Sequence, residues 1–333
     1  MAKMAIRMRK LFAVTLGTAA LVALCASAPV RAEDAWPTRP IQMVVASSAG
    51  SGTDALARLM AQRLSVSLKQ PVIVDNRPGG SGVVGTNVVV KAPADGYTLL
   101  YTTASNMVVA PAVLKTIPYD PKKSLVPIAE TAEGGVVLLV SNDLPVHNLP
   151  ELIQFVKANP DKYGYATWST GSSGQLTMEW LKKQTGMKTE HVPYRTSNQL
   201  LTDLASGVVK IGWTDPGAPV PFLRSGKVRA IAIAGNTRAP QLPEVKTMGE
   251  QGYKFDAVGW FGVFAPAGTN PAILKRLADE INKVQKSSDL AATMKTMNFG
   301  PPPATTSEQF RETVSRDLQL WSKIATDAGI QID

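Results

Sequence analysis

The stretch PIQMVVASSAGSGTDALARLM, residues 40–60, contains the unit from which the fold can be predicted. Its apolar run, residues 41–46, is short and rich in Val, which is typical of a buried strand. Small residues fill positions 47–53, and Asp54 then opens a helical pattern that reaches residue 68. A loop of Gly and Ser between a strand and a helix offers backbone N–H groups to an anion. The stretch therefore predicts an α/β unit, whose loop is either an anion site or an ordinary helix start.

A nucleotide phosphate is one anion that such loops bind, but the residues do not match a phosphate loop. GSGTDALAR lacks the Lys-Ser/Thr pair of a Walker motif, and it lacks G-x-G-x-x-G spacing as well. Asp54 and Arg58 are four residues apart, which predicts a structural ion pair in the first turns of the helix.

The same alternation of strand and helix continues along the chain. It predicts a parallel sheet built from βαβ units. The predicted strands are residues 41–46, 72–75, 97–102, 136–141, 163–168, 209–215 and 228–234. The predicted helices are residues 54–68, 82–91, 150–158, 175–184 and 198–206.

Two places suggest that the strands divide between two domains. An irregular Pro-rich passage, IPYDPKKSLVPIAE, precedes the apolar run near residue 138, and the run WFGVFAPAG near residue 262 is followed by helices. We therefore predict one lobe from residues 33–138 and 262–333 and an inserted second lobe from residues 139–261. Two chain crossings would leave a hinge and a cleft, which is a preferred place for ligands.

Five loops that follow predicted strands consist largely of Gly, Ser, Thr and Asn. Any one of them could be an ordinary helix start, because these residues cap helices well. Together they favour an anion site, because parallel strands bring their carboxyl ends to one edge. The loops are residues 47–54, 76–82, 102–106, 169–175 and 214–217.

The sequence offers little for catalysis. His147 is expected in a surface loop before a helix, and His191 is expected as a packed strand residue; neither has the spacing of a metal ligand. GSSG is one residue shorter than a nucleophile elbow. We therefore predict that the chain is not an enzyme and uses neither cofactor nor metal.

The N-terminus is typical of a Sec-type signal peptide. Four basic residues within the first ten precede an uncharged run, residues 11–26. Two cleavage sites compete, one after Ala28 and one after Ala32; the second is favoured, so we predict removal of residues 1–32. Leu24 before Cys25 argues against a lipoprotein, and the run is too short for a membrane anchor.

Loss of residues 1–32 lowers the formal charge from +9 to +4, because five basic residues and no acidic ones are removed. No basic cluster with aromatic residues remains, so nucleic acid is not expected as a partner. Cys25 is the only cysteine. An exported chain of this size without disulfides suits the periplasm.

Six stretches together resemble the solute receptors of tripartite tricarboxylate transporters (TTT), also called Bug-type receptors. Each stretch is unspecific by itself, but all six occur in the same order and at similar spacing. They are WPTRPIQMVV, SGTDALARLMAQRL, VDNRPGGSGVVGTNVVVKAPADGYTLL, HVPYRTSNQLLTDLASG, FLRSGKVRAIAIAGNTRAPQLPEVKTMGEQGY and WFGVFAPAGTNPAILKRL.

The resemblance implies a two-lobed α/β periplasmic-binding-protein fold, type II-like. It would have two parallel or mixed sheets, helices on both faces, and a cleft that closes like a Venus flytrap. It implies a monomer that captures a small organic carboxylate and delivers it to the membrane permease subunits of a TTT system. Carried onto this sequence, the ligand positions are Ser48, Ala49, Gly50, Ser51, Gly52, Ser81, Thr103, Ser105, Asn106, Thr170, Gly171, Ser172, Ser173 and Asp215.

Departures from the family leave the ligand open. The first loop reads ASSAGSGTD where many relatives have a Pro-rich loop, and Trp168 precedes the second-lobe loop where a small residue is common. Trp168 is either core or a cleft residue that could stack on a ring, so the ligand is an aliphatic or aromatic mono- or dicarboxylate. Asp215 could instead be a plain helix N-cap. A periplasmic sensor remains an alternative to transport, and an exported hydrolase is a less favoured one.

Overall fold

The computed structural model describes residues 36–255, 257, 259–302 and 306–331. The predicted signal peptide, both cleavage sites and Cys25 lie outside these residues. The chain divides into Met1–Thr38 and a compact unit, Arg39–Asp333, which contains two β-sheets. None of the described helices combines the length and apolar character that a membrane span requires.

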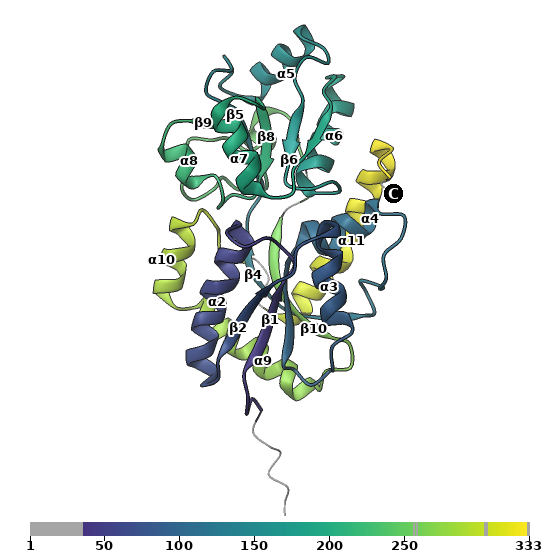
Figure 1. The fold of residues 1–333 in the computed structure, drawn as a ribbon, viewed down its shortest axis with the longest axis vertical. Coiled ribbons are helices and arrows are strands. Elements are labelled where there is room, and N and C mark those ends of the chain that lie inside the picture. The colour runs from purple at the N-terminus through teal and green to yellow at the C-terminus, as the bar shows by residue number, and fades with distance from the viewer. Residues whose placement is uncertain (1–35, 256, 258, 303–305, 332–333) are drawn as a thin grey trace, which may run out of the picture. The chain divides into compact units, whose positions relative to one another are not determined.

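The first sheet has five strands in the order β2-β1-β3-β10-β4 (Figure 1). β1 runs parallel to β2 and β3, whereas β10 runs antiparallel to β3 and β4, so the sheet is mixed. The strands are β1 (Ile41–Val45), β2 (Val72–Asn76), β3 (Thr98–Thr103), β4 (Leu125–Glu133) and β10 (Trp260–Pro266).

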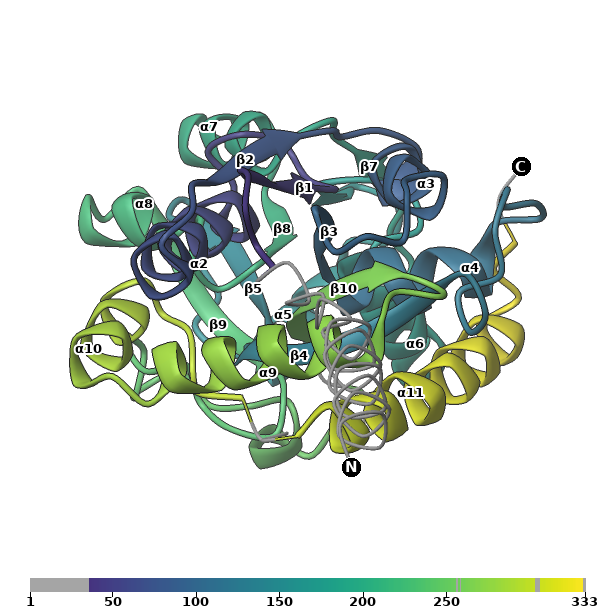
Figure 2. The same cartoon turned by 90° about the horizontal axis from the view of Figure 1, so that it is seen from below.

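Helices cover the first sheet. α2 packs on β1, β2 and α9, while α11 packs on β4 and α4 (Figure 2). The helices that accompany the first sheet are α2 (Gly52–Leu68), η1 (Gly80–Gly82), α3 (Val83–Val90), η2 (Ser105–Val109), α4 (Ala110–Val113), α9 (Pro271–Gln285), α10 (Ser288–Thr296) and α11 (Ser307–Ala328). We call the first sheet with these helices lobe 1.

The second sheet also has five strands, in the order β7-β6-β8-β5-β9. β6 runs parallel to β7 and β8, and β5 runs antiparallel to β8 and β9. Its elements, which we call lobe 2, are β5 (Val136–Ser141), α5 (Leu149–Ala158), β6 (Tyr165–Thr167), α6 (Ser173–Thr185), β7 (His191–Pro193), α7 (Ser197–Ser206), β8 (Ile211–Thr214), α8 (Val220–Arg224), β9 (Val228–Ala234) and η3 (Gly249–Gln251).

All seven predicted strands and all five predicted helices are present, with ends that differ by a few residues. The expected parallel pairing is found where β1 pairs with β2 and β3, and where β6 pairs with β7 and β8. The other pairs of neighbouring strands are antiparallel. The Pro-rich passage was expected to be irregular, but its second half forms β4. That strand contains Pro127 and pairs with β10 at the edge of the sheet, and an edge strand can accept a residue without an N–H donor.

The chain crosses between the sheets twice. It leaves lobe 1 between Glu133 and Val136 and returns between Ala234 and Trp260. Gly134 donates its N–H to the carbonyl of Gly259 at 3.0 Å, which ties the two crossings together. A Cβ on Gly259 would lie 2.3 Å from the Gly134 oxygen, so this approach requires glycine. The residue boundaries that we predicted for the lobes stay a prediction.

Candidate ligand-binding site

A cavity of about 750 Å³ lies where strands of both lobes end. Lobe 1 lines it with loops that follow β1, β2 and β3, and lobe 2 lines it with loops that follow β6, β7 and β8. Because these loops come from six separate strands, the cavity exists only after both sheets have assembled. The site therefore occupies the position at which α/β folds bind ligands.

Ten of the fifteen residues predicted for the ligand line this cavity. They are Ser48, Ser51, Ser81, Thr103, Ser105, Asn106, Trp168, Thr170, Ser173 and Asp215. The other five, Ala49, Gly50, Gly52, Gly171 and Ser172, do not line it. They belong to the same loops, and four of them hold those loops in shape.

The lobe 1 loop is shaped by the first turn of α2. Gly50 has a left-handed backbone with φ of 78°, and its N–H donates to Asp54 Oδ2 at 2.9 Å. Ser51 is the N-cap, and its Oγ accepts from Asp54 N–H at 3.2 Å. The Gly50 amide is therefore used inside the loop, while Ser48 and Ser51 face the cavity.

Asp54 is the centre of a small network. Its side chain is almost fully buried, and it receives Asn76 Nδ2 at 2.9 Å and pairs with Arg58 Nε at 3.0 Å. The predicted Asp54–Arg58 pair is confirmed. Burial by itself would raise the pKa of Asp54, but hydrogen bonds from Gly50, Arg58 and Asn76 outweigh it and lower the pKa below its ordinary value.

The lobe 2 loop repeats this arrangement at the start of α6. Gly171 is left-handed with φ of 72°, and its N–H donates to Gln175 Oε1 at 2.6 Å. Ser172 is the N-cap, and its Oγ accepts from Gln175 N–H at 3.3 Å. The Ser172 hydroxyl is fully buried against the helix, which leaves Thr170 and Ser173 to face the cavity.

His191 supports the lobe 2 loop from β7. Thr167 Oγ1 donates to the Ser169 carbonyl at 2.8 Å, so it accepts from His191 Nε2 at 2.7 Å. The imidazole also lies on the ring of Tyr165, with centroids 5.2 Å apart. Burial lowers the pKa of His191 to about 4, so the ring is neutral at pH 7. His191 is the packed strand residue that the sequence predicted, and His147 is exposed before α5 as expected.

Hydrogen bonds cross the cavity from one lobe to the other. Ser81 Oγ donates to the Thr170 carbonyl at 2.5 Å, and Ser173 N–H donates to Ser105 Oγ at 3.1 Å. Ser81 has a left-handed φ of 54° within the turn that follows β2. These two hydrogen bonds hold lobe 2 against lobe 1, and Ser81, Ser105 and Ser173 also line the cavity.

Asp215 also joins the lobes. Its Oδ1 accepts from the N–H groups of Gly217 and Ala218 at 3.0 and 2.9 Å, and the Gly52 amide at the start of α2 bonds to it as well. A Cβ on Gly52 would lie 2.1 Å from Oδ1. Burial raises the pKa of Asp215, although these amides act in the opposite direction. Asp215 is not the N-cap of α8, because Pro219 holds that position.

Donors remain for a ligand. Several donors at the cavity have no hydrogen-bond acceptor within residues 36–255, 257, 259–302 and 306–331. They are the N–H groups and hydroxyls of Ser48 and Thr170 and the hydroxyl of Thr53. All three residues line the cavity. Amide and hydroxyl donors on facing sides of a cavity suit a carboxylate, which accepts hydrogen bonds through both oxygens.

Aromatic residues form much of the remaining wall, namely Trp168, Tyr194, Trp260 and Phe261. Trp168 is half-buried and faces the cavity, so of the two alternatives left open by the sequence the structure favours the cleft residue. The loop after β7, with Tyr194 and Arg195, was missed because β7 has only three residues. The polar string YRTSN directly after VP was the signal that could have found it.

Titratable side chains do not gather here. Within the described ranges, no group of three or more His, Cys, Asp or Glu side chains could hold a metal ion. Among the described residues that line the cavity, Arg195 is the only cation and Asp215 the only acid.

Comparisons with known proteins agree with this geometry. The family model described as "Tripartite tricarboxylate transporter family receptor" matches residues 56–330. Protein BugT of Bordetella pertussis is 36% identical over 308 residues, which covers 92% of this chain and 94% of BugT.

Two solved structures share the fold. "R. palustris Rpa4515 with adipate" has a TM-score of 0.85 at 33% identity, covering 89% of this chain and 99% of that one. "MatC (Rpa3494) from Rhodopseudomonas palustris with bound malate" has a TM-score of 0.81 at 27% identity, covering 87% and 99%. The predicted two-lobed periplasmic-binding-protein fold is confirmed, and the chain belongs to the tripartite tricarboxylate transporter family of receptors.

Proposed function

We propose that this protein is an extracytoplasmic solute receptor that captures a small organic carboxylate between its lobes. The observation that carries the proposal is the pair of loops 47–53 and 168–173, one from each lobe, whose free N–H and hydroxyl donors line one cavity. Adipate and malate, which the two solved relatives hold, are both carboxylates. Their overall fold and their level of identity make the same class of ligand the best expectation here.

Within this proposal fourteen of the fifteen predicted residues have one of two kinds of role, and Ala49 has neither. Ser48, Thr170 and the other cavity residues contact the ligand or the water around it. Gly50, Gly52, Gly171 and Ser172 shape the loops that carry those contacts. The lobes, with the boundaries predicted from the sequence, would open at the glycine-containing crossings and close on the ligand.

We further propose binding without turnover. A hydroxyl nucleophile needs a base within hydrogen-bond reach, and the described cavity residues include neither His nor Lys. Export to the periplasm as a soluble monomer and delivery of the ligand to a TTT permease complete the proposal. We expect cells that lack this receptor to take up the ligand more slowly than wild-type cells. An unchanged rate of uptake would contradict the delivery role.

A thermal-shift screen tests the ligand class. Malate, succinate, adipate, hexanoate, benzoate and terephthalate would be compared with adipamide, which keeps the chain of adipate but carries no charge. A ligand at 100 times its Kd adds about 2.7 kcal/mol to the free energy of unfolding. We expect at least one acid to raise Tm while adipamide does not. A panel without any shift, or an equal shift with adipamide, would contradict the proposal.

A further inference from the structure

Arg195 occupies a fixed place at the edge of the cavity. It follows β7 directly, where Tyr194 N–H donates to the Thr167 carbonyl at 2.8 Å and so extends the pairing of β7 with β6. The next residue, Thr196, is the N-cap of α7, and its Oγ1 accepts from Gln199 N–H at 3.2 Å. The backbone of Arg195 is therefore held on both sides, while its side chain is exposed and lines the cavity.

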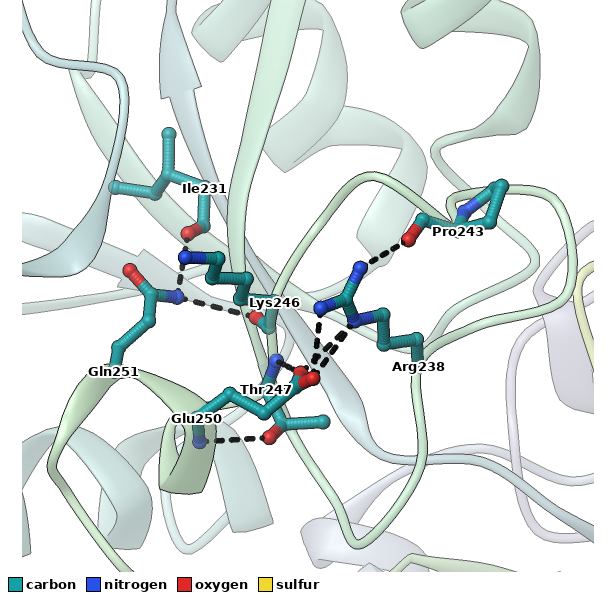
Figure 3. Close-up of polar contacts among 7 residues, drawn as sticks. All are labelled: Ile231, Arg238, Pro243, Lys246, Thr247, Glu250 and Gln251. Atoms are coloured by element: carbon teal, nitrogen blue, oxygen red, sulfur yellow. Dashed lines mark hydrogen bonds and ion pairs between the residues drawn. The ribbon is translucent and has the colours of Figure 1, made fainter.

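The guanidinium of Arg195 has no acceptor among the described residues. Several other described arginines pair with acids, among them Arg58 and Arg238. Arg238, also in lobe 2, contacts both oxygens of Glu250 and donates to the Pro243 carbonyl at 2.6 Å (Figure 3). Arg58 pairs with Asp54 beside the lobe 1 loop. An unpaired guanidinium at a cavity that accepts anions is a binding group still available to a ligand.

The order of strands makes the cavity electrostatically uneven. In the second sheet β6 lies between β7 and β8. The loop after β6, residues 168–172, is therefore flanked by Arg195 after β7 and by Asp215 after β8. A ligand whose first carboxylate is held at the central loop meets a cation on one side and a carboxylate on the other. A second negative group would go to the Arg195 side.

We propose that Arg195 binds the second anionic group of the ligand, and that the preferred ligand is consequently a dicarboxylate. The proposal deepens the proposed function and rests on it. A guanidinium presents parallel N–H donors that match the two oxygens of a carboxylate, so Arg195 recognises the far end of the molecule. The cavity of about 750 Å³ is large enough for a chain or a ring between two such ends.

The test measures selectivity by titration calorimetry with matched acids. The pairs are succinate with butyrate, adipate with hexanoate, and terephthalate with benzoate, and each pair differs by one carboxylate. The variants are Arg195→Met, Arg195→Lys and, as control, Arg224→Met. Arg224 is an exposed arginine of α8 in the same lobe that does not line the cavity, so its loss removes the same charge elsewhere.

We expect the wild type to prefer the dicarboxylate of at least one pair. Arg195→Met should weaken that dicarboxylate by about tenfold or more and leave its monocarboxylate partner unchanged. Arg195→Lys should keep part of the preference, because it retains the charge but not the paired donors. Arg224→Met should bind like the wild type. A merely structural role of Arg195 would lower both affinities and leave their ratio unchanged.

Two results would overturn the assignment of Arg195 and leave the proposed function standing. One is a wild type that binds each monocarboxylate as tightly as its dicarboxylate. The other is Arg195→Met with an unchanged ratio of affinities, whether both members of a pair weaken or neither does. If no acid binds the wild type, the proposed function fails first and the dicarboxylate assignment fails with it.

Discussion

In lobe 1, a left-handed glycine, Gly50, precedes the N-cap Ser51 and gives its N–H to the side chain of Asp54. In lobe 2, Gly171, Ser172 and Gln175 repeat this arrangement with the same spacing. Both loops line the cavity, one from each lobe. In both loops a left-handed glycine and a capped first turn place neighbouring residues at the cavity.

The loops differ in the group that receives the glycine N–H. Asp54 is a carboxylate that also binds Arg58 and Asn76, whereas Gln175 is a neutral amide. The shape therefore follows from hydrogen-bond geometry and not from charge. The charge in lobe 1 adds strength, because hydrogen bonds to an ionised group are stronger, but it also makes that loop depend on pH.

The largest expected effect comes from breaking the lobe 2 arrangement at its glycine. Gly171→Val places a β-branched residue at φ of 72°, a conformation that such residues rarely adopt. The loop should change its path and move the Thr170 donors. We expect the affinity for the carboxylate to fall by more than about a hundredfold in calorimetry, because several hydrogen bonds to a charged group are lost together.

Gly186→Val is the control for this variant. Gly186 ends the same helix with φ of 74°, and no heavy atom lies within 4 Å of the position that a Cβ would take. Its substitution should cost similar backbone strain and leave binding intact. Circular dichroism should show a native fold for both variants. If Gly171→Val binds like the wild type, the lobe 2 loop is only a helix start and the proposed site is wrong.

The second prediction uses pH to separate the two loops. Because the folded pKa of Asp54 lies below its ordinary value of 3.8, the unfolded chain takes up this proton first as the pH falls. The stability that Asp54 adds is thus present above about pH 4 and is lost as the pH falls toward the folded pKa. Asp54→Asn should lower the free energy of unfolding at pH 7 by about 1–2 kcal/mol.

Thermal unfolding between pH 3 and pH 7 measures this difference. The gap between wild type and Asp54→Asn should shrink in acid. Gln175→Ala removes the neutral side chain that accepts the Gly171 N–H in lobe 2. It should lower the free energy of unfolding by an amount that does not change as Asp54 titrates. A gap for Asp54→Asn that stays constant over the whole range would show that the ionised form of Asp54 contributes nothing.

The smallest effects are expected at the two N-caps. Ser51→Ala and Ser172→Ala each remove one side-chain acceptor at a helix start, which costs about 1 kcal/mol of stability. Ser51 lines the cavity and Ser172 does not, so only Ser51→Ala should also weaken the carboxylate measurably. Urea unfolding and calorimetry on the pair provide both numbers. Equal losses of affinity would mean that the caps act through loop shape alone.

Much of the architecture could be predicted because it depends on local patterns. Val-rich runs such as β5 have strand bounds that the sequence reproduces, and Asp54 and Arg58 meet because residues four apart share one face of a helix. The Ser, Thr and Gly content of the loops identified the class of site. The strands β4, β7 and β10 were not predicted from local patterns. β4 was missed because Pro127 looks like a strand breaker until its strand is known to lie at an edge.

The sequence by itself thus determined most of the strands and helices, the family and most of the loops that line the cavity. Only the tertiary structure decided which groups in those loops remain free. Gly50 and Gly171 were predicted to face the ligand, but each gives its N–H to a side chain four residues later. Arg195 was overlooked, yet it lines the cavity because β7 pairs with β6. The direction of an N–H group or a side chain depends on left-handed turns and on strand neighbours distant in sequence, and residue types alone do not encode either.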